Sequence, residues 1–107
     1  MEALFFQTAS ANLLLGFMPD TLGWIYYKKE LYTPAVEQLK KAVALDEAAA
    51  SKGGTSPNSA YRLRLGMALA SAGDKPSAKR EVEISLQRGQ SLSVQETQDA
   101  KNLLANL

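Results

Sequence analysis

Apolar residues recur along this chain at intervals of three and four positions, which is the spacing of one face of an α-helix. Turn-forming and helix-capping residues divide the pattern into six segments. The spacing predicts helices over about 2–15, 19–30, 33–49, 59–72, 75–88 and 93–107. We therefore expect an all-α protein.

The boundaries of several predicted helices carry specific capping signals. Thr33 and Pro34 combine a hydroxyl cap with a proline at the first helical position, where its missing N–H is not needed. Gly73 suits the left-handed turn that ends many helices. Ser93 and Glu96 have the spacing of a capping box, in which each side chain accepts a hydrogen bond from a free backbone N–H. These signals predict turns between the helices independently of the apolar spacing.

One spaced pattern occurs twice in the chain. Gly23 precedes Ala35 by twelve residues, and Gly66 precedes Ala78 by the same interval. After each alanine, small or apolar residues follow at steps of four and three: Leu39 and Ala42 in the first copy, Val82 and Ser85 in the second. Such a recurrence predicts two helical hairpins that each need a neighbour to cover an apolar face. We expect Gly23 to lie against Ala35 and Gly66 against Ala78, because small residues let two helices approach closely.

The doubled pattern resembles the tetratricopeptide repeat (TPR) over about residues 16–107. The resemblance is strongest in Leu22–Tyr27 and Leu65–Ala68. The blocks Asp20–Trp24 and Asp99–Leu104 also look like the closing repeats of long bacterial TPR proteins. The resemblance implies two TPR-like hairpins in a right-handed solenoid stack, with an N-terminal helix and a C-terminal capping helix.

The connection between the two copies is longer than the family pattern. Gly23 and Gly66 are 43 residues apart, whereas the TPR period is about 34. The excess must fall between Asp46 and Asn58, as a longer loop or as an extended helix with a loop, and Asn58 or Ser59 is expected to cap the next helix. The expected organisation is a single domain, 1–107, made of an N-terminal helix (1–18), repeat one (19–49), an inserted loop (50–58), repeat two (59–92) and a capping helix (93–107).

In TPR proteins the first helix of each hairpin lines a concave surface that holds peptides or partner proteins. By register, the resemblance places these residues on that surface: Phe17, Asp20, Trp24, Tyr27 and Lys28 from the first copy, and Leu63, Met67, Ala70 and Ser71 from the second. Tryptophan and tyrosine are frequent binding anchors because they bury a large area at low entropic cost. The alternative is that the large members of this set pack against residues 2–15 or against a second copy of the chain.

Composition argues against several classes of function. Twelve basic and eleven acidic residues leave a net charge of +1, and no segment concentrates either sign enough to attract nucleic acid or a membrane surface. The absence of Cys and His removes thiol catalysis, the usual zinc ligands and the commonest proton-transfer residue. We expect no catalytic residue, cofactor or metal, and the sequence leaves the compartment open. Arg62, Arg64 and the adjacent acids Asp46 and Glu47 are expected to be solvated, and the apolar run 11–18 is too short to span a bilayer.

The favoured function is a non-catalytic scaffold that binds a protein or peptide through the concave face. The alternative is a self-associating structural module from a larger bacterial TPR protein, with a homodimer formed through the N-terminal apolar helix or a swapped hairpin. A helical enzyme or ligand carrier is the least favoured class, because no nucleophile, base and oxyanion donor can be named as a set. The stretch 53–56 also lacks the spaced glycine and lysine of a phosphate-binding loop.

Overall fold

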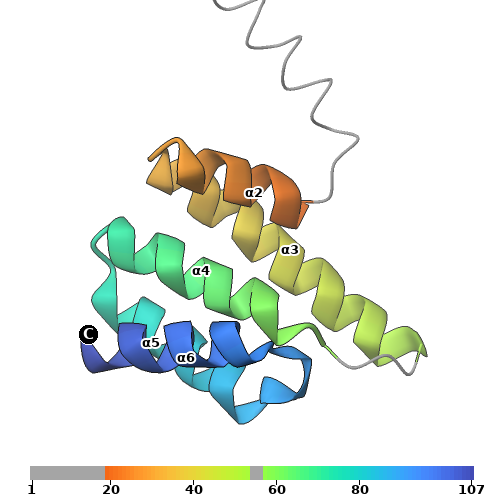
Figure 1. The fold of residues 1–107 in the computed structure, drawn as a ribbon. Coiled ribbons are helices and arrows are strands. Elements are labelled where there is room, and N and C mark those ends of the chain that lie inside the picture. The colour runs from red at the N-terminus through yellow and green to blue at the C-terminus, as the bar shows by residue number, and fades with distance from the viewer. Residues whose placement is uncertain (1–18, 54–56) are drawn as a thin grey trace, which may run out of the picture.

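The computed structural model describes residues 19–53 and 57–107, and this part of the chain is helical and contains no strand. The helices are α2 (Pro19–Lys28), α3 (Tyr32–Gly53), α4 (Ser59–Ser71), α5 (Lys75–Gln87) and α6 (Val94–Ala105), with a short 3₁₀ turn, η1 (Gly89–Ser91), before α6 (Figure 1). The all-α prediction is confirmed for these residues. The helix predicted over 2–15 lies outside them.

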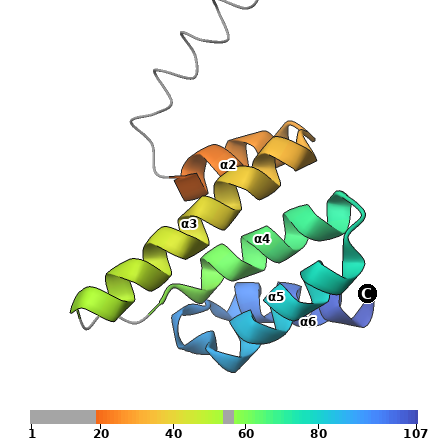
Figure 2. The same cartoon turned by 180° about the vertical axis from the view of Figure 1, so that it is seen from behind.

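The helices are arranged as two antiparallel pairs and a final helix. A short turn joins α2 to α3 and another joins α4 to α5, so the members of each pair lie side by side (Figures 1 and 2). Helix α4 also packs against α3, which brings the two pairs together, and α6 lies against α5 and α4. Helix α4 is the central element of the part that the structure describes, since both of its core clusters include residues of α4.

In each helix pair, a glycine of the first helix lies against a side chain of the second helix. The contact has the same geometry in both pairs. A Cβ atom on Gly23 would lie 2.6 Å from Leu39 Cγ, and a Cβ on Gly66 would lie 2.6 Å from Val82 Cγ2. Leu39 and Val82 are matching positions of the doubled pattern, so the two crossings are equivalent. The expected partner of Gly23 was Ala35, and the nearest side chain is instead one helical turn further along α3. Ala35 is nevertheless fully buried.

Within the described residues the core consists of two clusters. The larger one joins α3, α4 and α5 and contains Ala35, Val36, Leu39, Leu65, Ala68, Leu69 and Ala78. The smaller one joins α4, α5 and α6 through Leu63, Val82 and Ala100. All the small or apolar residues that follow the glycines in the doubled pattern are buried, including Ser85. The pattern therefore marks interior positions, as helical hairpins that share a core require.

Several predicted helix ends are confirmed. The Asn58 side chain accepts a hydrogen bond of 3.0 Å from the Ala60 backbone N–H, so Asn58 is the cap of α4. Gly73 has a φ of +95°, the left-handed conformation that glycine adopts without strain. Ser93 and Glu96 form both hydrogen bonds of the capping box at the start of α6.

The boundaries of α3 differ from the prediction at both ends. The helix already includes Tyr32, and the Ala35 N–H bonds to the Leu31 carbonyl, so Thr33 and Pro34 lie inside the first turn. At the other end α3 continues to Gly53, past the expected helix end at residue 49, which agrees with the alternative of an extended helix after Asp46. The alanine-rich stretch before Gly53 favours helix, which explains the extension.

Candidate functional site

Two aromatic side chains of α2 stack on each other. The rings of Trp24 and Tyr27 lie 4.8 Å apart between centroids with an angle of 6° between their planes. Tyr32, at the start of α3, lies 5.7 Å from Tyr27 in a tilted arrangement. Trp24 and Tyr27 are both half-buried, and Tyr27 also packs against the larger of the two core clusters. Aromatic side chains held in this way offer a rigid apolar surface.

Cationic groups flank this stack. Lys28 Nζ lies 4.9 Å from the centroid of the Trp24 ring, and Arg64 Cζ, from α4, lies 5.1 Å from it. Arg64 Nη1 also forms an ion pair with Asp20 Oδ2 near the start of α2. We call the set Trp24, Tyr27, Lys28 and Arg64 the aromatic face. Cations over aromatic rings are attracted by about 0.5–1 kcal/mol at exposed sites, which helps to hold this face in place.

The structure separates the two halves of the predicted concave surface. From the first copy, Asp20, Trp24, Tyr27 and Lys28 lie together on α2, while Phe17 lies outside the described residues. From the second copy, Leu63 is only 3% exposed and belongs to the core cluster with Val82 and Ala100, so its assignment to an open surface is corrected.

The remaining predicted surface residues of the second copy differ from one another in their burial. Met67 is partly buried against the same cluster as Leu63, and Ala70 is partly buried against the larger cluster. Ser71 is exposed at the end of α4. The physical reason is that α6 packs over the face of α4 that the register predicted to be open.

Arg64 was not predicted as a site residue, because its contacts depend on residues far away in the sequence. It was expected to be solvated, whereas it pairs with Asp20, 44 residues earlier. Asp20 is 8% exposed, and its Oδ1 is buried without a hydrogen-bond partner among the described residues. No local pattern around Arg64 indicates this pairing.

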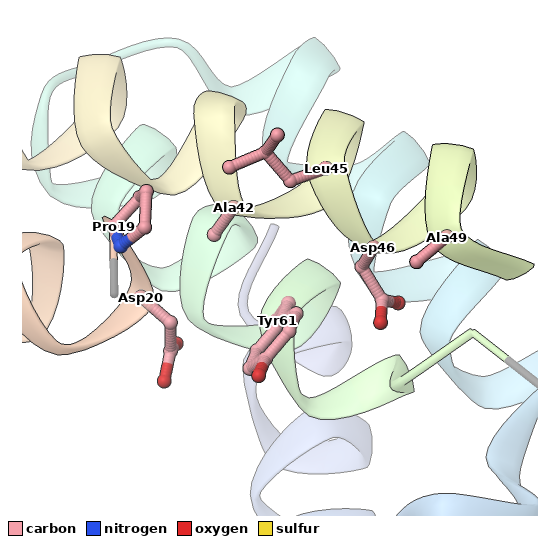
Figure 3. Close-up of a pocket in the computed structure, with 7 residues that line it drawn as sticks. All are labelled: Pro19, Asp20, Ala42, Leu45, Asp46, Ala49 and Tyr61. Carbon is pink, nitrogen blue, oxygen red and sulfur yellow. The ribbon is translucent and has the colours of Figure 1, made fainter. Parts of the chain in front are cut away.

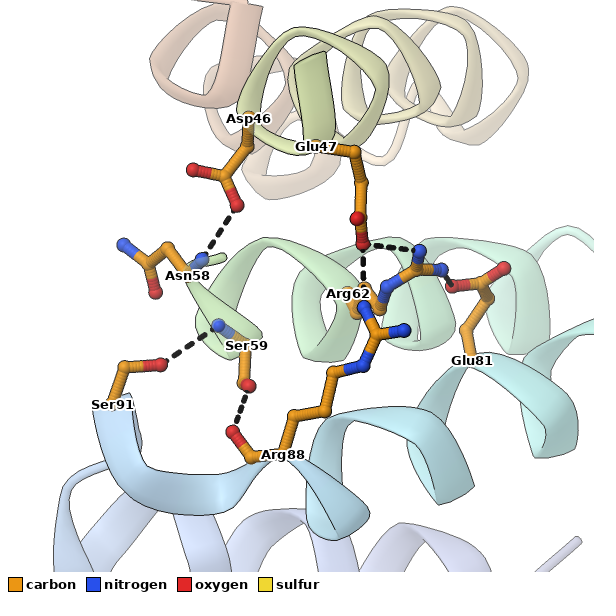
Figure 4. Close-up of polar contacts among 8 residues, drawn as sticks. All are labelled: Asp46, Glu47, Asn58, Ser59, Arg62, Glu81, Arg88 and Ser91. Carbon is orange, nitrogen blue, oxygen red and sulfur yellow. Dashed lines mark hydrogen bonds and ion pairs between the residues drawn. The ribbon is translucent and has the colours of Figure 1, made fainter. Parts of the chain in front are cut away.

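A second polar cluster connects three helices, and Figure 4 shows it. Arg62 of α4 donates to Glu47 Oε1 of α3 at 2.7 Å and to Glu81 Oε2 of α5 at 2.8 Å (Figure 4). Arg88, just after α5, also donates to Glu47 Oε1 at 2.7 Å. We call these four residues the arginine junction. The expectation that Arg62 and Glu47 are simply solvated was wrong, since both bridge the two helix pairs.

The arginine junction changes the acidity of its members. The hydrogen bond from Arg62, with the positive charges of Arg62 and Arg88, lowers the pKa of Glu47 below its ordinary value of 4.5, although partial burial acts in the opposite direction. Burial disfavours the Arg62 cation, but its hydrogen bonds to Glu47 and Glu81 outweigh this effect and raise the pKa of Arg62. Both shifts favour the ionised forms of Glu47 and Arg62.

Backbone contacts hold the start of α4 next to the junction. The Asn58 N–H donates to Asp46 Oδ2 at 2.5 Å, so Asp46 is also engaged and not fully solvated. The Ser59 N–H donates to Ser91 Oγ at 2.8 Å, and the Ser59 hydroxyl donates to the Arg88 carbonyl (Figure 4). These bonds tie the segment before α4 to both α3 and η1. The arrangement is therefore a structural joint between α3, α4 and η1.

An apolar groove lies beside the start of α2, and Figure 3 shows its lining. The groove has a volume of about 130 Å³ and is lined by Pro19, Asp20, Ala42, Leu45, Asp46, Ala49 and Tyr61. In the view of Figure 3 the carboxylates of Asp20 and Asp46 lie on either side of the Tyr61 ring. We call this feature the acidic groove. No local residue pattern predicts it, because its lining comes from three helices.

Residues 19–53 and 57–107 hold no group of three or more side chains suited to bind a metal ion. In the same ranges, no helix has both the length and the apolar character needed to cross a membrane. Comparisons of the chain with known protein families, curated proteins and solved structures find no match, so the function must be argued from the geometry.

Proposed function

We propose that this chain is a non-catalytic scaffold of the TPR type that binds a protein or peptide partner through the aromatic face. The proposal takes the α2–α3 and α4–α5 pairs as two TPR-like hairpins in a right-handed solenoid, with α6 as the capping helix. It is supported by the equivalence of the two glycine crossings, at Leu39 in the first pair and Val82 in the second. Helices that repeat one packing unit are typical of binding scaffolds.

The single observation that carries the proposal is the stacking of the Trp24 and Tyr27 rings at a partly exposed position on α2. Two large rings stack at 4.8 Å on a short helix and are only partly buried, although Tyr27 also packs against the larger core cluster. Lys28 and Arg64 hold the indole from α2 and α4, which reduces the entropy that a partner would otherwise have to overcome. A preorganised aromatic pair with neighbouring cations is suited to an apolar peptide that also carries an acidic residue.

The proposal can be tested by selecting peptides from a displayed random library on the full chain and measuring their affinity by calorimetry. Trp24 is the only tryptophan of the chain, so a change in its fluorescence also reports directly on binding at this face. We expect Trp24→Ala to weaken the selected peptides by at least about tenfold, as hot-spot aromatics do. Circular dichroism must show that the variant remains helical.

Val94→Ala is the matched control, because Val94 is 91% exposed on α6 and belongs to neither core cluster. It should leave affinity unchanged. Equal affinity of the wild type and Trp24→Ala for the selected peptides would contradict the proposal. Light scattering over a dilution series tests the alternative function, a self-associating structural module. A molecular mass that rises with protein concentration would indicate self-association.

A further inference from the structure

The acidic groove owes its shape to the unequal lengths of two paired helices. Helix α2 has 10 residues and α3 has 22, so α2 covers only part of its partner. Leu45 lies on α3 at the edge of the covered part and is 55% exposed, a high value for a leucine inside a helical protein. Together with Ala42, Ala49 and the Tyr61 ring it forms an apolar surface. The volume of about 130 Å³ is close to that of cavities, roughly 150 Å³, that admit a group the size of benzene.

The charge of the groove has one sign. Its lining contains two carboxylates, Asp20 and Asp46, and no lysine or arginine. Asp46 receives the Asn58 N–H but forms no ion pair with any described residue. Asp20 is paired with Arg64 through Oδ2, while its Oδ1 has no hydrogen-bond partner within the described ranges. The groove therefore combines an apolar surface with one carboxylate, that of Asp46, which no cation of the described residues neutralises.

We propose that the acidic groove binds a basic–apolar segment of a partner protein, in which an apolar side chain stands next to a lysine or arginine. The apolar side chain packs against Leu45, Ala42 and Ala49, which removes exposed leucine surface from water. The adjacent cation lies near Asp46 and completes the pairing that this carboxylate lacks in the free protein. This surface differs in chemistry from the aromatic face, and the proposal does not depend on the function proposed there.

A segment of the chain itself is the competing occupant. Residues 1–18 end directly at Pro19, which lines the groove, and they include the apolar residues that predict a helix. However, this segment contains no lysine or arginine, because the first basic side chain of the protein is Lys28. It could cover the apolar surface but could not supply a basic side chain to Asp46. The two occupants therefore predict different responses to charge.

The experiment titrates the ¹⁵N-labelled full chain with two capped tetrapeptides, Lys-Leu-Leu-Lys and Glu-Leu-Leu-Glu, while amide chemical shifts are recorded. The lysine peptide should shift the amides of Leu45, Asp46 and Ala49, and it should bind at least about fivefold more tightly than the glutamate peptide. The difference should fall in about 0.5 M NaCl, because salt screens the charge term. Trp24 fluorescence should stay constant, which separates this result from binding at the aromatic face.

Two variants with matched controls test the individual contributions. Leu45→Ala should weaken the lysine peptide several-fold, while Leu31→Ala, at a leucine that is 47% exposed elsewhere, should not. Asp46→Asn keeps an oxygen for the Asn58 N–H and removes the charge, so it should weaken the lysine peptide and leave the helices intact. Glu83→Gln, at an exposed acid of α5, is its control.

Three results would overturn the proposal. The first is equal affinity for the two peptides in low salt. The second is the absence of shifts at the groove amides when the lysine peptide is present at millimolar concentration. The third is a set of nuclear Overhauser contacts from residues 1–18 to Leu45 and Tyr61, which would show that the chain fills its own groove.

Discussion

At the scale of single residues, two glycines decide how closely the helices of each pair can approach. Both Gly23 and Gly66 leave no room for a Cβ atom, but their neighbours differ in stiffness. Backbone atoms lie similarly close to both Cβ positions, Leu39 N at 3.2 Å for Gly23 and the Ala78 carbonyl oxygen at 3.3 Å for Gly66. The side-chain atom that faces Gly66 belongs to a β-branched valine, Val82. Leu39, opposite Gly23, has more freedom to change its rotamer. The second crossing should therefore tolerate a methyl group less well than the first.

We predict that Gly66→Ala and Gly23→Ala both destabilise the protein, with the larger effect at Gly66. Overpacking costs typically about 1–3 kcal/mol, and the gain in helix propensity from glycine to alanine offsets up to about 1 kcal/mol of it. Urea denaturation followed by circular dichroism measures the free energy of unfolding. Gly53→Ala is the control, because no heavy atom lies within 4 Å of its Cβ position, and it should be neutral or slightly stabilising. A Gly66→Ala variant as stable as the wild type would contradict the crossing geometry.

At the scale of helices, α6 is the element whose capping has the clearest consequence. The Ser93 hydroxyl accepts the Glu96 N–H at 3.0 Å, and Glu96 Oε1 accepts the Ser93 N–H at 2.9 Å. The helix that begins there places the fully buried Ala100 against Leu63 and Val82. The capping box that starts α6 therefore also supports the packing of α6 on α4 and α5.

Ser93→Ala should lower the free energy of unfolding by about 1 kcal/mol, the usual effect of losing an N-cap side chain. It should also speed amide hydrogen exchange in α6 more than in α3, because the change acts on the final helix first. The control is Ser71→Ala, an exposed serine whose side chain makes no hydrogen bond within the described ranges. Unchanged exchange in α6 would show that the capping box contributes little to the order of this helix.

At the scale of the whole molecule, the arginine junction connects the two helix pairs. Glu47 comes from α3, Arg62 from α4 and Glu81 from α5, so all three helices meet in one set of ion pairs. The hydrogen bond from Arg62 lowers the pKa of Glu47 in the folded state below 4.5. A carboxylate with a lowered folded-state pKa stabilises the fold above its unfolded-state pKa, and this stabilisation is lost as pH falls through the folded-state value.

We predict that Glu47→Gln destabilises the protein by roughly 0.5–1 kcal/mol at pH 7, as partly exposed ion pairs do. The difference from the wild type should persist down to about pH 4.5 and shrink below it, because Glu47 then becomes protonated in the wild type as well. Urea denaturation at several pH values measures both quantities. Glu83→Gln, at an exposed acid that forms no ion pair with a described residue, should show no such difference. A Glu47→Gln effect that is constant between pH 7 and pH 3 would contradict the proposed role of the junction.

Local features of the chain predicted most of the fold. The order of the described helices, the caps at Asn58 and Ser93, the left-handed Gly73 and the burial of the doubled pattern were all expected. The site was predicted less well. Trp24, Tyr27 and Lys28 lie together because they share one helix, whereas Leu63 was misassigned because its exposure depends on the position of α6.

The sequence by itself determined where helices form and which side of each is apolar, because these properties depend on residues within a few positions of one another. The tertiary structure alone decided which helix covers which face, and with it the Asp20–Arg64 pair, the arginine junction and the acidic groove. Each of these features joins residues that are distant in the chain. Their contacts arise only when the packing of one helix on another sets the distances between side chains, which no local spacing encodes.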